Sequence, residues 1–345
     1  MNLLEPWVLL RFAAGLVACL LFARGALTAQ RVLRHFDLKR ATEGQLALEK
    51  RIELAATFVR VGTVVQVLAL VLTALGADRM SRGVRGAMCA YGVFGANEWG
   101  FRSLAVTGGV ALVAGVLAQI YAFDARVRSL DLARPVAAMT LAMFPLSVLD
   151  LAVAMEFLGK LDLTAVASCC SVQLDAVAAT GGGYASGPRV VATILAAAGT
   201  CASIATALFA WRAPTKARVA IAGLVTLVTL PLAGAASVLE VAPHAFEVPH
   251  HVCPFCLLRS DVFAIGYPLY GALFLAAIWG IGAGASALLA RGPAARDALA
   301  PFARKLLRRG AIAWALAFAL AAIPVARFAI VSGGASLFED ERSQR

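Results

Sequence analysis

The sequence predicts an all-α integral membrane protein, a single polytopic domain built as a bundle of about eight transmembrane helices. Hydrophobic residues make up 61% of the 345 residues, charged residues make up 15%, and the mean hydropathy is +0.82. A soluble domain is about 45–50% apolar and about 25% charged, so it could not bury this much apolar surface. The same composition excludes intrinsic disorder, a coiled coil and a disulfide-rich miniprotein.

Each predicted span is a continuous apolar run of about 20 residues, which favours a helix over the alternating strand of a barrel. In chain order the spans lie near 7–29, 54–77, 102–123, 135–158, 189–211, 218–239, 262–290 and 310–333. The first span has Glu5 and no basic residue ahead of it. It therefore lacks the positive region of a signal peptide, and we expect a permanent helix.

Lys and Arg are distributed unevenly between the two sets of loops. Most of the 31 basic residues follow the first, third, fifth and seventh spans, which predicts that those connections are cytoplasmic. Both termini and the loops 78–101, 159–188 and 240–261 should then lie outside. This bias accounts for the net charge of +11 without a nucleic-acid partner. The charged stretch 30–53 predicts a cytoplasmic amphipathic helix or, preferably, a solvated extension of its neighbouring spans.

The cysteines gather on the predicted outer side. Cys19 and Cys201 lie inside spans, where a thiol behaves as a small apolar group. The outer five are Cys89, Cys169, Cys170, Cys253 and Cys256. The outside of a bacterial inner membrane is oxidising, so this clustering suits disulfide chemistry in that membrane. Because five is an odd number, one cysteine is left over as a thiol or a ligand if the rest form disulfides.

The most specific motif is His-His-Val-Cys-Pro-Phe-Cys over residues 250–256, just before the span 262–290. If the motif opens that helix, Pro254 takes the first helical position and Cys253 the cap, where unpaired N–H groups favour a thiolate. This arrangement predicts a redox pair in which Cys253 reacts first and Cys256 resolves. Cys169 or Cys170 would be the exchange partner.

Cys-Pro-Phe-Cys resembles the redox centre of glutaredoxins over these four positions. A Cys-x-x-Cys at the outer end of a helix, with further cysteines in another outer loop, also resembles quinone-linked disulfide-generating membrane proteins, which are four-helix bundles. The resemblance implies thiol–disulfide exchange with a quinone or with a periplasmic thioredoxin-like partner.

Two other interpretations of the motif remain open. His250, His251, Cys253 and Cys256 offer donors for zinc or copper, and the histidines of this loop leave non-covalent haem open. The protein could also be a non-catalytic subunit of a larger membrane complex, with disulfides that only staple its outer loops.

Four charged residues lie at membrane depth in the outward halves of predicted spans. They are Arg11, Asp150, Glu156 and Arg327. Buried charges in a membrane are costly, which makes them functional candidates. The preferred hypothesis is a buried ion pair that holds the first, fourth and eighth spans together. The functional alternative is a proton route or a pocket for a quinone headgroup.

Overall fold

The computed structural model describes residues 5–36, 43–87, 89–127, 130–162, 187–249 and 251–338. These residues contain helices and no strand, and eight of the helices are long and apolar enough to cross a membrane. The eight are α1 (Pro6–His35), α2 (Glu43–Met80), α4 (Gly100–Asp124), α5 (Ala133–Gly159), α7 (Gly187–Arg212), α8 (Lys216–Ala236), α10 (Gly266–Leu289) and α11 (Pro293–Val331). The predicted class, a multi-pass helical membrane protein, is confirmed.

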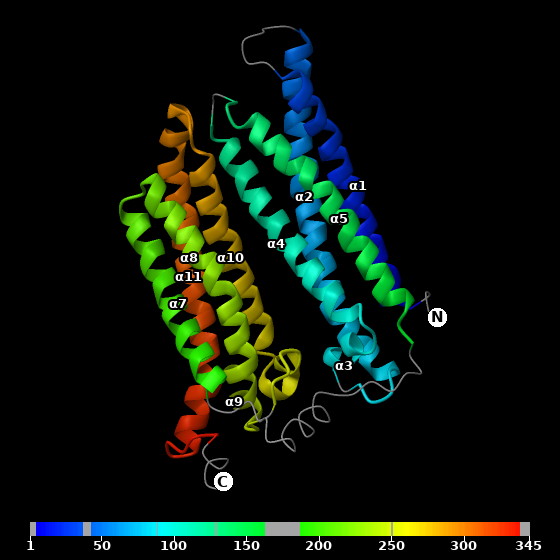
Figure 1. The fold of residues 1–345 in the computed structure, drawn as a ribbon, viewed down its shortest axis with the longest axis vertical. Coiled ribbons are helices and arrows are strands. Elements are labelled where there is room, and N and C mark those ends of the chain that lie inside the picture. Colours follow the sequence, from blue (N-terminus) through cyan, green and yellow to red (C-terminus); the bar gives the residue numbers. More distant parts are fainter. Residues whose placement is uncertain are drawn as a thin grey trace.

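The helices form two groups of four (Figure 1). In the first group α1 packs on α2, α2 on α4, α4 on α5, and α5 returns to α1; α7, α8, α10 and α11 repeat this order, and α4 packs on α10 to join the groups. Although the sequence shows no repeat of fixed period, the two halves share one arrangement of contacts. The α2–α4 and α8–α10 connections therefore occupy equivalent positions, at the end of the molecule where α1 begins and α11 finishes.

Short elements fill these two connections. The first contains the 3₁₀ turn η1 (Ser81–Gly83) and α3 (Ala90–Gly95). The second begins with the π-helix η2 (Ser237–Val241) and α9 (Ala242–Phe246) and continues through the 3₁₀ turns η3 (Cys256–Leu258) and η4 (Ser260–Val262). Figure 1 shows α3 and α9 at the same end of the two groups.

Of the stretch 30–53, the structure describes residues 30–36 and 43–53. Residues 30–35 belong to α1 and residues 43–53 belong to α2, and the solvation of these extensions stays a prediction. Residues 45–61 contain neither Gly nor Pro, so nothing in the sequence stops the helix at the edge of the apolar run.

Glycines allow α8 and α10 to approach each other closely. A Cβ added to Gly223 of α8 would lie 2.7 Å from the Cα of Gly284 in α10, and one added to Gly280 would meet Thr226 at 2.5 Å. Helices in a lipid environment gain no hydrophobic drive to associate, so backbone approach of this kind supplies van der Waals contact instead. The contact lies near the start of α8 and the end of α10, away from the second connection, and fixes how these two helices pack.

Candidate functional site

Three cysteines converge where the two halves meet. Cys89 directly precedes α3, and Cys253 and Cys256 lie between α9 and α10. Their Sγ atoms all lie within 4.8 Å of one another, and the Cys89 and Cys253 sulfurs are 3.5 Å apart. All three are thiols in this structure, and their exposed fractions are 0%, 0% and 6%. We call Cys89, Cys253 and Cys256 the three-cysteine centre.

Aromatic side chains surround the three-cysteine centre. The Phe94 ring of α3 lies 5.5 Å from the Phe157 ring and 5.3 Å from the Phe255 ring, measured between centroids. These rings belong to the same buried apolar cluster as the three cysteines. The loop that contains Cys89 therefore folds into a short helix that shields the thiols from water.

The first turns of α10 support the turn that contains Cys253 and Cys256. The Tyr270 hydroxyl donates a hydrogen bond of 2.8 Å to the carbonyl of Pro254. The backbone N–H of Arg259 donates to the carbonyl of Cys256 over 3.0 Å. A Cβ on Gly266 would lie 2.9 Å from the backbone of Leu257, so glycine lets the start of α10 approach the turn. These contacts hold the turn in place.

The predicted helix start at the motif is wrong. The helix predicted over 262–290 begins at Gly266 and is preceded by Ile265, so Cys253 is not its cap. Phe263 and Ala264 have φ values of 57° and 52°, and an α-helix cannot continue through two left-handed residues. The helix-dipole argument for a reactive Cys253 thiolate therefore does not apply.

The structure changes the membership of the predicted site. Cys253 and Cys256 are joined by Cys89, which the sequence analysis placed on the outer side but not in the site. His251 stacks on Phe246 with centroids 4.1 Å apart and is not one of the converging groups. The exchange partners Cys169 and Cys170, and the predicted metal ligand His250, lie outside the described residues. In the sequence, only the odd number of outer cysteines indicated that a further cysteine could act as a ligand beside Cys253 and Cys256.

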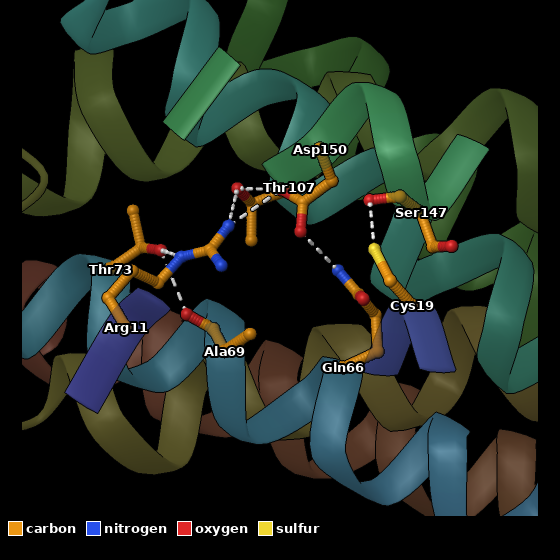
Figure 2. A network of polar contacts seen from close by, with 8 residues as sticks. All are labelled: Arg11, Cys19, Gln66, Ala69, Thr73, Thr107, Ser147 and Asp150. Atoms are coloured by element: carbon orange, nitrogen blue, oxygen red, sulfur yellow. Dashed lines mark hydrogen bonds and ion pairs between the residues drawn. The ribbon is translucent and has the colours of Figure 1, made fainter. Parts of the chain in front are cut away.

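The charges at depth separate into one buried pair and two surface pairs. Arg11 of α1 donates to Asp150 of α5 over 2.8 Å (Figure 2), and both side chains are almost fully buried. Thr107 of α4 donates to the same carboxylate oxygen, and Gln66 of α2 donates to the other oxygen over 2.8 Å. Arg11 also donates to Thr73 over 2.7 Å. The predicted ion pair is confirmed for Arg11 and Asp150, and its network ties together all four helices of the first group.

The other two predicted members do not join this network. Glu156 lies 2.9 Å from Lys160 one turn away, and Arg327 lies 3.4 Å from Glu247. All four side chains are about half exposed, because they sit near helix ends rather than within the packed groups. The prediction that the eighth span takes part in the ion pair is therefore wrong.

The Arg11–Asp150 network leaves little room for a ligand. The void beside Arg11, bounded also by Trp7 and Thr73, measures about 10 Å³. That volume is close to the roughly 10–15 Å³ that one water requires, so no quinone ring fits there. The network links the four helices of the first group, and the proton route stays a prediction.

The fold and the three-cysteine centre define a multi-pass helical membrane protein with a buried thiol centre between two four-helix halves. The chain matches no protein-family model, no curated protein and no solved structure.

Proposed function

We propose that the protein binds a soft metal ion, Cu(I), at Cys89, Cys253 and Cys256. The observation that carries the proposal is the convergence of three buried sulfurs within 4.8 Å of one another. One ion can be reached by all three donors from such an arrangement. The aromatic wall of Phe94, Phe157 and Phe255 would protect a bound ion from water and from oxidation.

The donor set favours Cu(I) over other soft ions. Thiolates select Cu(I), zinc and iron–sulfur clusters. A structural zinc site is almost always four-coordinate, and among the described residues no His, Asp or Glu joins the three sulfurs. Cu(I) accepts a three-sulfur environment. Because each ligand binds as a thiolate, loading should release protons.

We place the protein in a bacterial inner membrane with the three-cysteine centre at its outer, periplasmic end. The distribution of Lys and Arg between alternate loops supports this orientation. The protein would then handle copper at the periplasmic surface and exchange it with a periplasmic metal or thiol protein. A membrane-impermeant thiol reagent should label a Ser336→Cys variant in intact spheroplasts, in a chain whose Cys169, Cys170 and Cys201 are replaced by Ser; labelling only after lysis would reverse the orientation.

Cu(I) titration of the purified protein against a chromogenic chelator, without oxygen, tests the proposal. We expect one Cu(I) per chain, with Cys89→Ser, Cys253→Ser and Cys256→Ser each weakening the affinity at least about tenfold, the effect typical of a lost interaction at a metal site. Cys201→Ser is the matched control, because Cys201 is exposed on α7. Failure to bind Cu(I), or an equal loss in the control, contradicts the proposal.

Thiol–disulfide redox is the second candidate function, and the 3.5 Å separation of the Cys89 and Cys253 sulfurs favours it. A disulfide there would release two electrons and two protons, which a quinone or the disulfide of a thioredoxin-like partner could accept. Alkylation and mass spectrometry of protein purified in air distinguish the candidates. A Cys89–Cys253 or Cys253–Cys256 disulfide that mild reductants open, in a protein that binds no Cu(I), would favour redox.

A further inference from the structure

The second group of helices contains a cavity of about 390 Å³, well away from the Arg11–Asp150 network. Its walls come from α7, α8, η2, α10 and α11, and they consist mainly of alanine with Leu269, Leu273 and Phe318. The volume falls within the range of roughly 300–1,000 Å³ that small-molecule sites occupy. A flat ring with methyl groups and the start of an apolar chain would fill it.

One end of the cavity is polar and holds a buried ion pair. Glu240, which lines the cavity, forms an ion pair with Arg189 and accepts a hydrogen bond of 3.1 Å from Thr193. Arg189 and Glu240 are only 12% and 13% exposed, and the ring of Phe338 covers Arg189 with a centroid distance of 3.6 Å. Because the two charges neutralise each other, this end suits a neutral head group rather than a phosphate or a carboxylate.

Glu240 lies on the π-helix η2, between Ser237 and Val241. A single π-helical turn within a membrane helix re-aims the side chains around it, and such turns are frequent at functional sites. Here the π-helical turn follows α8, and its Glu240 carboxylate lies at the cavity wall.

The cavity wall also contains a hydrogen-bond donor that lacks an acceptor. Trp314 of α11 lines the cavity and is 1% exposed, and its indole N–H has no hydrogen-bond partner among the described residues. Leaving a buried donor unsatisfied is costly, and most buried donors are paired. The nitrogen is itself covered, so the carbonyl oxygen of a ligand would become its acceptor with a small turn of the Trp314 ring toward the cavity.

We propose that this cavity binds a lipid-soluble quinone, with its neutral carbonyl-bearing ring between Trp314 and the Glu240 end and its isoprenoid chain along the alanine-lined walls. A phospholipid or a fatty acid fits less well, because Arg189 is paired with Glu240 and, among the described residues, no Arg, Lys or His lines the cavity; His244 lies 3.6 Å from the other Glu240 oxygen but is not part of the wall. This binding site is independent of the proposed metal centre and goes beyond it.

Photolabelling with an azidoquinone tests the proposal on the full chain in lipid nanodiscs, with peptide mass spectrometry as the readout and decylubiquinone as competitor. We expect saturable label on α7 and α11 that decylubiquinone displaces. Ala321→Phe, which fills the cavity, should weaken competition at least about tenfold because a packed site does not accommodate added volume. Ala319→Phe is the matched control on the exposed face of the same helix.

Trp314→Phe keeps an aromatic ring but removes the N–H, and it should weaken decylubiquinone binding about fivefold, the value of one hydrogen bond. If Ala321→Phe fails to fold, Trp314→Phe still tests whether the cavity binds the quinone. Cys253→Ser should leave quinone binding unchanged, which separates this site from the metal centre. Equal labelling in Ala321→Phe and Ala319→Phe, unchanged binding in Trp314→Phe, or a phospholipid that decylubiquinone does not displace would overturn the proposal.

Discussion

The Arg11–Asp150 pair owes its stability to its neighbours as much as to its charges. Asp150 accepts three hydrogen bonds, one each from Arg11, Gln66 and Thr107. Arg11 donates two more, to the hydroxyls of Thr107 and Thr73. A buried pair repays the cost of desolvation only when such extra hydrogen bonds are present. Replacing either Arg11 or Asp150 alone should therefore lower the stability of the protein.

We predict that Asp150→Ala lowers the free energy of unfolding by about 3–5 kcal/mol, because it leaves the Arg11 guanidinium buried without its counter-charge. Thermal unfolding in detergent micelles measures the change. Arg11→Met combined with Asp150→Leu should recover much of the loss. Glu156→Ala is the control, since its exposed pair with Lys160 is worth only about 0–1 kcal/mol; equal melting of Asp150→Ala and the parent protein would refute the prediction.

Charges at membrane depth were predictable from the sequence because they are costly there, but their partners were not. Depth alone left Arg11 and Arg327 as equal candidates for Asp150, and only the packing of α1 on α5 decides between them. The neutral members of the network, Gln66, Thr73 and Thr107, were missed because uncharged polar residues are common in membrane helices.

At the scale of the element, the turn that carries Cys253 and Cys256 depends on α10 for its shape. Tyr270→Phe removes the hydrogen bond to the Pro254 carbonyl, which is worth about 0.5–1.5 kcal/mol. We expect Cu(I) affinity to fall by about three- to tenfold while the stoichiometry stays unchanged, as measured by chelator competition. Tyr267→Phe, half exposed one turn earlier on α10, should have no effect. A loss of the same size in both variants would show that the hydrogen bond does not position the turn.

The α8–α10 contact gives a second prediction at this scale. Gly223→Ala should destabilise the protein, because the new Cβ would meet the Gly284 backbone at 2.7 Å and neither backbone can move aside alone. Gly234→Ala on the same helix has nothing within 4 Å and should be neutral or stabilising by up to about 1 kcal/mol. Unfolding temperatures compare the two. A Gly223→Ala variant as stable as Gly234→Ala would mean that the helices are not this close.

The eight spans were predictable because each is one long apolar run, whereas the start of α10 was not. Nothing in the side chains of Phe263 and Ala264 favours a left-handed backbone, so the apolar run was extended back to 262. Cys89 was also missed as a site residue. Cys89 and Cys253 lie in two connections that are far apart in the chain. The residue spacing within either connection therefore does not predict their contact.

At the scale of the whole molecule, the three-cysteine centre links the two four-helix groups. We predict that dibromobimane, a short thiol cross-linker, joins Cys89 to Cys253 or Cys256. If a protease site is inserted between residues 163 and 186, the cleaved halves should then migrate as one band under denaturing conditions. Cys89→Ser should abolish the linkage and Cys201→Ser should not. Separate halves in the parent protein would contradict the observed packing of the two groups.

The most direct test of the central claim is X-ray absorption at the copper edge of the Cu(I)-loaded protein. We expect a first shell of sulfur only, with three sulfurs per copper, and the loss of one sulfur in each of Cys89→Ser, Cys253→Ser and Cys256→Ser. A first shell that contains nitrogen, or a three-sulfur shell that survives in Cys89→Ser, would contradict the assignment of these three cysteines as the metal ligands.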